Sequence, residues 1–135
     1  MSAQLWALAV AGIVVLAAAG LETYRSRRAR RRAAGATATP AAEPYILYFT
    51  GDSCTVCRTH QEPALSKLER VRVEKVDAVR DRALADRFHV YTLPTTVVMG
   101  ADGRALHVNY GYAPAPKLER QLASARDAGL RTATA

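Results

Sequence analysis

The sequence predicts an α/β domain with a four-stranded mixed sheet flanked by helices, preceded by one transmembrane helix. The first observation is a charge-free apolar run of seventeen residues near the N-terminus, Leu5 to Leu21. The second is that, from Tyr45 onward, short apolar runs alternate with helical stretches in the order β-α-β-α-β-β-α. Half of the residues are hydrophobic and 23% are charged, which excludes a disordered chain. A length of 135 residues allows one domain and an appendage.

The apolar run has the composition of a membrane-spanning helix, although seventeen residues are at the short end of the range that crosses a bilayer. Trp6 lies at one end of the run, where an indole favours the membrane interface. A cleaved secretory signal carries its positive charge before its apolar stretch, whereas here the arginines follow it. We therefore expect residues 1–22 to be a single-pass anchor in the cell membrane. A cleaved signal, indicated by the A-x-A pattern of Ala17 and Ala19, and a buried core helix remain alternatives.

The formal charge of +7 is concentrated in six arginines that closely follow the apolar run. These are Arg25, Arg27, Arg28, Arg30, Arg31 and Arg32. Beside a membrane span, such a cluster is expected to contact anionic lipid headgroups and to lie on the cytoplasmic side. The folded domain is therefore expected in the cytoplasm, with an extracytoplasmic domain as the alternative. From Tyr45 onward there are thirteen Lys and Arg against ten Asp and Glu, so we expect no nucleic-acid partner.

Small residues and two prolines fill residues 33–44, which is typical of a linker. We therefore divide the chain into the anchor at 1–22, an Arg-rich juxtamembrane segment and linker at 23–44, and a domain at 45–130. Strands are predicted where apolar or alternating runs are bounded by turn residues: 45–49, 71–76, 95–99 and 105–110. Helices are predicted at 54–70, 80–88 and 117–128. Pro63 is expected to bend the first helix or change its register, and Gly129 to cap the last one.

The stretch DSCTVCR at 52–58 holds both cysteines, at the point where the first predicted strand meets the first predicted helix. Three further features lie in register with it: Asp77 closes the second strand, FHVYTLPT leads to Pro94, and Gly111 follows the fourth strand. Together these features resemble the thioredoxin family over about residues 45–126. The resemblance implies a minimal thioredoxin-like fold that lacks the family's first strand and helix. It also implies a cis peptide bond before Pro94.

Thiol-disulfide exchange explains the spacing of the two cysteines. Only a thiolate attacks a disulfide, and the unpaired N–H groups of a helix N-terminus suit the thiolate of Cys54. Cys57 follows three residues later on the same helical face, so its sulfur can displace the bound substrate. We expect Cys54 to be the nucleophile and Cys57 the resolving thiol, acting on disulfide- or thiol-containing proteins or on small thiols. A thiol reductase is expected to recycle the pair, and we expect no cofactor.

The residues around the pair complete the predicted site. Pro94 is expected to face the cysteines, and a cis bond there exposes the backbone of Thr92 and Leu93 to an extended substrate strand. Ser53 is expected at the rim of the site, where many thioredoxins have tryptophan. Tyr48 stands where thioredoxins bury an acid that is thought to take the proton of the resolving thiol. These departures keep open a second reading, a thioredoxin-fold binding or redox-sensing module with little catalysis.

A metal site is the third possibility, because the two cysteines and His60 form a C-x2-C-x2-H pattern. A structural zinc takes four ligands, and the chain has no second cysteine pair to complete them. His89 or His107 would have to contribute, but His107 alternates with Asn109 on a strand face that we expect to be solvated. We therefore predict no metal. Covalently bound c-type haem is excluded because Arg58, and not histidine, follows the second cysteine.

Overall fold

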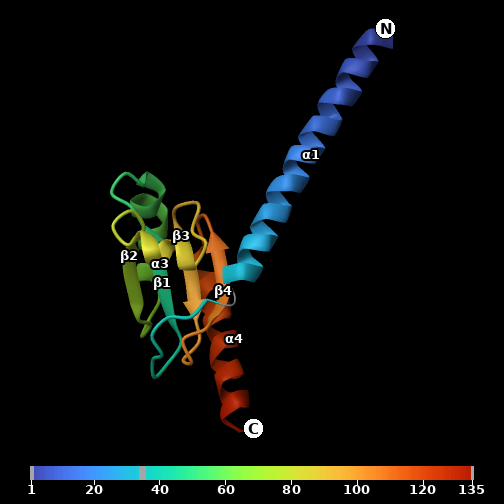
Figure 1. Cartoon of the computed structure of the whole chain (residues 1–135). Coiled ribbons are helices and arrows are strands. Elements are labelled where there is room, and N and C mark those ends of the chain that lie inside the picture. Colours follow the sequence, from blue (N-terminus) through green and yellow to red (C-terminus); the bar gives the residue numbers. More distant parts are fainter. Residues whose placement is uncertain (1, 34–35, 135) are drawn as a thin grey trace.

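The computed structural model describes residues 2–33 and 36–134 (Figure 1). Its helices are α1 Ser2–Ala33, the π turn η1 Cys57–Gln61, α2 Glu62–Ser66, α3 Arg82–Arg87 and α4 Ala115–Ala133. Its strands are β1 Tyr45–Thr50, β2 Val73–Asp77, β3 Thr95–Met99 and β4 Ala105–Tyr110. The third and fourth strands have the bounds that the sequence predicts. The second begins two residues later than predicted and ends at Asp77.

The four strands form one mixed sheet in the order β2-β1-β3-β4, which confirms the predicted fold class. β1 and β2 are parallel, with Ile46 opposite Val73, and the other two pairs are antiparallel. The β3–β4 hairpin contains a register shift at Val98 and Met99. Because β1 runs parallel to β2 and antiparallel to β3, the last residues of β1 and the first residues of β3 lie at the same end of the sheet. The cysteines lie at this end of the strands, which we call the active-site end.

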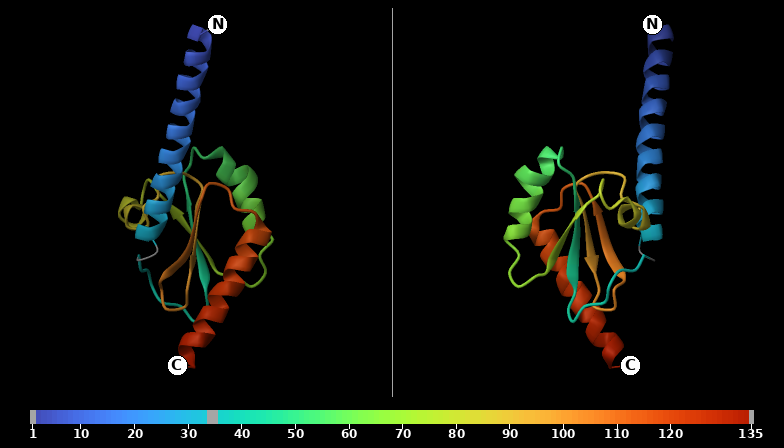
Figure 2. Two further views of the ribbon diagram at one scale, coloured as in Figure 1. Left: turned by 90° about the vertical axis from the view of Figure 1, so that its right-hand side faces the viewer. Right: turned by 60° about the vertical axis from the view of Figure 1, so that its left-hand side comes forward.

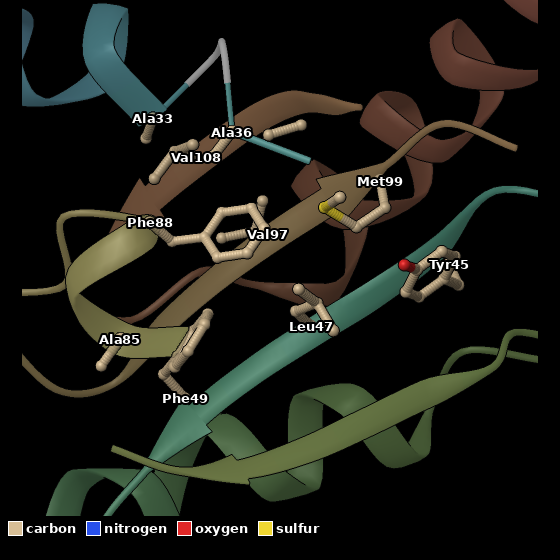
Figure 3. Packing of buried hydrophobic residues seen from close by; sticks show 11 residues of the cluster. Ala33, Ala36, Tyr45, Leu47, Phe49, Ala85, Phe88, Val97, Met99 and Val108 are labelled. Carbon is tan, nitrogen blue, oxygen red and sulfur yellow. The ribbon is translucent and has the colours of Figure 1, made fainter. Parts of the chain in front are cut away.

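Helices cover both faces of the sheet (Figure 2). One face packs α3 with its C-cap Phe88, the end of α1 and residues 36–41 against strand side chains such as Leu47, Phe49 and Val97 (Figure 3). The other face packs α2 and α4 against the alternate side chains of the same strands, including Ile46 and Val98. Successive residues of a strand point to opposite faces, so burial of both faces explains the continuous apolar run of β1.

Helix α1 does not end with its apolar run but continues through the arginines to Ala33, whose side chain is fully buried in the core. Among the described residues, α1 is the one helix that is both long enough and apolar enough to cross a membrane. The mean hydropathy of its apolar stretch is 2.1, and this stretch is wholly exposed. A signal sequence near an N-terminus has the same properties. The arginines therefore lie on a continuous helix, and the side chain of Arg30 is outside what the structure describes.

Residues 36–41, which the sequence assigns to a linker, are packed against the domain, and the predicted linker residues 34 and 35 lie outside the described part of the chain. The backbone N–H of Ala38 donates to the carbonyl of Gly103 at 2.8 Å, and that of Ala41 donates to the carbonyl of Ala101 at 3.0 Å. Gly103 has φ +81°, and a Cβ there would stand 2.5 Å from the carbonyl oxygen of Ala38. The small side chains that resemble a linker in the sequence thus permit close packing on the β3–β4 turn.

Two predicted helix ends are also wrong. Helix α4 continues past Gly129 to Ala133, because Gly129 is exposed and tolerated within a helix, and Thr132 Oγ1 donates to its carbonyl at 2.9 Å. The helix expected to reach residue 70 ends at Ser66, with Lys67 as its C-cap. Arg70 adopts φ 54°, a left-handed conformation that no helix continues through.

Candidate active site

The cysteine pair lies at the active-site end of the sheet, directly after β1. Residues 51–54 turn after Thr50, with the N–H of Cys54 donating to the carbonyl of Gly51 at 3.0 Å, and the helix begins at Thr55. Cys54 and Cys57 are joined in a disulfide with an S–S distance of 2.08 Å. Cys57 is completely buried against the α2–α4 side of the core, whereas Cys54 is partly exposed. An attacking thiol of another molecule therefore reaches Cys54 first.

The local electrostatics also distinguish the two sulfurs. The backbone N–H of Cys57 donates to Sγ of Cys54 at 3.2 Å. Unpaired N–H groups and the positive end of the helix dipole meet at this position, and both stabilise negative charge on the first cysteine of the motif. The guanidinium of Arg58 donates to the carbonyl of Asp52 and so fixes the loop before the pair. This arrangement can hold Cys54 as a thiolate after reduction.

Pro63 changes the register of the active-site helix, as the sequence predicts. Its ring nitrogen has no hydrogen to donate to the carbonyl of Thr59, and a π turn precedes it, closed by the N–H of Glu62 bonding to the carbonyl of Cys57. The π turn lies between residues 57 and 61, so the helix is wider next to the resolving cysteine.

Gln61, within this turn, is a residue that the sequence analysis missed. Its side chain is completely buried, and its amide forms two hydrogen bonds with the backbone of Ala113: Nε2 donates to the carbonyl at 3.0 Å, and the Ala113 N–H donates to Oε1 at 2.9 Å. Since 52 residues separate the two, this clamp joins the active-site helix to the segment before α4. No local sequence pattern marks a glutamine as such a clamp.

A groove of about 540 Å³ runs beside Cys54. The structure brings Ser53, Thr92 and Leu93 into its lining, together with Val79, Arg82 and Tyr91, which the sequence did not indicate. The Leu93–Pro94 peptide bond is cis, as the resemblance implies. Thr95 Oγ1 donates to the Thr92 carbonyl at 2.8 Å, and the Gly111 N–H donates to the Pro94 carbonyl at 2.8 Å. The predicted substrate-binding residues thus share one groove, and their contact with a substrate stays a prediction.

Tyr48 occupies the interior position where the resemblance expects an acid. Its hydroxyl lies 3.3 Å from Thr50 Oγ1, and burial raises the pKa of the phenol. The group therefore stays neutral near pH 7 and takes no proton from a thiol. Lys75, opposite Tyr48 on β2, pairs with Glu62 at 2.6 Å, and this hydrogen bond raises the pKa of the lysine.

The histidines do not gather around the cysteines. His60 lies 2.7 Å from Thr59 Oγ1 through Nδ1, and its ring packs edge-on against Tyr112. The predicted solvated face at His107 is wrong, because α4 covers that side of β4: Asn109 is buried there and exchanges two hydrogen bonds with Gln121. Burial lowers the pKa of His107. Within residues 2–33 and 36–134, no three His, Cys, Asp or Glu side chains come close enough to hold a metal ion.

The fold and the bonded cysteines are those of a known family, because a family model described as a thioredoxin-like domain matches residues 32–126. This chain belongs to the thioredoxin-like family. The match begins at residue 32, so it includes the end of α1 and the packed segment that follows. The fold and the Cys54–Cys57 pair together support thiol-disulfide exchange as the general chemistry of this thioredoxin-like protein.

Solved thioredoxins are similar to the domain of this thioredoxin-like protein. A mutant thioredoxin from Halobacterium salinarum NRC-1 is 28% identical, with a TM-score of 0.57, and the match covers 62% of this chain and 75% of that one. Oxidised mitochondrial thioredoxin 3 from Saccharomyces cerevisiae is 27% identical, with a TM-score of 0.53 and coverage of 61% and 78%. Thioredoxin-2 of the malaria parasite, at 24% identity, a TM-score of 0.55 and coverage of 61% and 82%, shows the fold alone. No curated protein matches the sequence.

Proposed function

We propose that this protein is a membrane-anchored thiol-disulfide oxidoreductase in which Cys54 attacks and Cys57 resolves. The asymmetry of the pair is the observation that carries the proposal. Cys54 is accessible from a groove and accepts a hydrogen bond at a helix N-terminus, whereas Cys57 is buried directly behind it. A substrate sulfur can therefore form a mixed disulfide with Cys54 only, and Cys57 is within bonding distance to break it.

The exchange balances without a cofactor. The Cys54 thiolate attacks one sulfur of a substrate disulfide, the substrate S–S bond breaks, and the departing thiolate takes a proton from solvent. Cys57 then loses its proton, attacks Cys54, and releases the second substrate thiol as the protein disulfide forms. Two electrons pass from the cysteine pair to the substrate. A thiol reductase returns two electrons to the pair, and the reverse sequence would oxidise substrate dithiols.

Helix α1 supports the anchoring part of the proposal. Its apolar stretch is exposed along its length, and the described arginine side chains follow on the same helix. In a membrane this order favours a cytoplasmic redox domain with the arginines at anionic headgroups. The rival arrangement is an extracytoplasmic domain behind a signal sequence. Protease added to intact cells should leave the domain uncut until the membrane is permeabilised; digestion in intact cells would place it outside.

A trapping experiment tests the chemistry. In a Cys57→Ser variant of the full chain, substrates should accumulate as mixed disulfides on Cys54 and be released by a reductant, and mass spectrometry then names them. A Cys54→Ser variant is the matched control and should trap nothing, because Cys57 is buried.

The second candidate, a binding or redox-sensing module, is favoured by the neutral Tyr48 at the position of the expected acid. It would be supported if neither variant trapped a partner while the unaltered chain still bound one.

A further inference from the structure

We propose that the groove beside Cys54 opens directly onto the lipid headgroups, so that the substrates are disulfides or thiols of membrane proteins held within the headgroup layer. The inference rests on the proposed function and names the substrate class for the same site. It follows from where α1 is docked, from the direction in which the helix leaves the domain, and from the short distance between its apolar run and the groove.

The last part of α1 is fixed to the domain at two places. At its end, Ala33 is completely buried in the core. Seven residues earlier, Ser26 Oγ lies 2.9 Å from the hydroxyl of Tyr91. The helix between them spans about 10 Å at 1.5 Å per residue. Two contacts that far apart define the direction of the helix as well as its position.

This direction leads past the active-site end of the sheet, where the cysteines lie. Just after α1, the carbonyl of Ala36 accepts a hydrogen bond from Ala105 at the opposite end of β4. Tyr91 belongs to the loop before Pro94 and lines the groove beside Cys54. Followed towards its N-terminus, the helix therefore runs from the middle of the sheet towards the active-site end and continues beyond it (Figures 1 and 2).

The apolar run ends five residues before the contact with Tyr91. Those residues, from Leu21 to Ser26, span about 7.5 Å of helix. A headgroup layer is roughly 5–7 Å thick on each side of the hydrocarbon, from the overall bilayer dimensions. Tyr91 consequently lies at the outer boundary of the headgroups when the apolar run fills the hydrocarbon. Val79, in the same groove lining, is 73% exposed and offers apolar surface at this level.

Arginines provide the second, independent observation. Arg25, Arg28 and Arg32 line a cavity of about 990 Å³ between α1 and the domain, and this cavity adjoins the groove through Tyr91 and Val90. Two carboxylates, Glu22 and Asp86, share the lining, so the guanidinium groups outnumber them. Within the described residues these three guanidinium groups have no ion-pair or hydrogen-bond partner. Arg25 lies about 6 Å of helix beyond Leu21, within the headgroup layer, and Arg28 about 10.5 Å beyond it, from where its long side chain can extend back to the phosphates. Lipid phosphates would supply the acceptors that these two arginines lack and hold the domain in the docked pose, whereas Arg32, about 16.5 Å beyond Leu21, lies outside the layer.

A height-resolved exchange assay tests the inference on the full-length protein in vesicles of mixed phosphatidylcholine and phosphatidylglycerol. One probe is a disulfide attached directly to a phosphatidylethanolamine headgroup, and the other is the same disulfide at the end of a long hydrophilic polymer on the same lipid. The reduced protein should react about ten-fold faster with the headgroup probe, because the docked domain raises the effective concentration only at that height. Equal rates would overturn the inference, while an absence of reaction with either probe and with a soluble small disulfide would overturn the proposed function itself.

Two sets of variants separate height from general activity. A flexible eight-residue Gly-Ser insertion between Glu22 and Thr23 leaves the docked turns intact but frees the domain from the span, so the preference for the headgroup probe should fall to about two-fold or less. Its rate with a soluble small disulfide should stay unchanged. Arg28→Gln should lower the preference, whereas Arg27→Gln, an exposed arginine outside the cavity lining, should not. A preference that survives the insertion would overturn the inference.

Discussion

Replacing Gln61 with methionine should destabilise the domain more than the same replacement of a partly exposed helix glutamine. The variant keeps a side chain of similar length and volume, so it leaves no large cavity. It removes both hydrogen bonds to Ala113 and leaves a backbone N–H and a carbonyl without partners in a fully buried position. Each unsatisfied buried group costs about 1–3 kcal/mol, and the apolar side chain offsets part of the loss, so we expect about 2–4 kcal/mol.

The measurement is denaturant unfolding of the full-length protein in detergent, followed by far-ultraviolet circular dichroism. Gln121→Met is the matched control, since that glutamine also makes two hydrogen bonds, to Asn109, but is only partly buried. Asn109 is buried but keeps its hydrogen bond to Thr96 Oγ1, and water can approach from the partly exposed position of residue 121, so the control should lose less than about 1.5 kcal/mol. A loss for Gln61→Met no larger than that of the control would refute the idea that the clamp stabilises the active-site helix.

Three further outcomes are expected. In the reduced protein, Cys54 should be alkylated faster than Cys57 below pH 8, because Cys57 is completely buried, and equal slow alkylation of both would contradict the assignment of roles. The domain has no tryptophan, so Ser53→Trp should create an indole fluorescence that changes on oxidation, and an indole that ignores the redox state would remove Ser53 from the rim of the groove. The N–H groups of Arg80 and Val79 hold the pKa of Asp77 below its usual 3.8, so its charge stabilises the fold above that pH. Asp77→Asn should therefore lower the unfolding free energy near pH 7, with a difference that disappears as the pH falls below 4 and through the lowered pKa; a difference independent of pH would exclude a contribution from the charge.

The sequence predicts the parts of this structure that depend on short-range patterns. The strands at 95–99 and 105–110 are correct because an apolar run, a turn and an alternating run define a hairpin locally. The cysteine pair follows from the spacing of its motif, and the cis bond before Pro94 from the resemblance to the thioredoxin family. The sequence also predicts that Pro63 bends the active-site helix or changes its register, because a proline inside a helix removes one backbone donor. This effect is local and does not depend on distant parts of the chain; the structure shows it as a π turn.

Contacts between distant segments were not predictable in this way. The glutamine that clamps Ala113 is 52 residues away from it, and Tyr91 is 65 residues away from Ser26. The alanines at 36–41 have the composition of a linker, and only the shape of the β3–β4 turn makes them part of the core. The helix end predicted at Gly129 is wrong: no neighbouring atom lies within 4 Å of a Cβ built at this glycine, and α4 continues through it to Ala133.

In the proposed anchored arrangement, the open side of β2 bears on how copies of the protein meet in the plane of the membrane. β2 is the outer strand of the sheet, and within the described residues no strand pairs with its far side, so its free backbone groups could pair with another sheet. Copies tethered by the same anchor would all present this edge at one height, which makes lateral encounters frequent. The strand is short, and Glu74 and Lys75 place a charge on each of its faces. Two such strands meeting antiparallel would set Glu74 against Glu74 or Lys75 against Lys75, and like charges directly opposite one another disfavour the pairing of the two sheets.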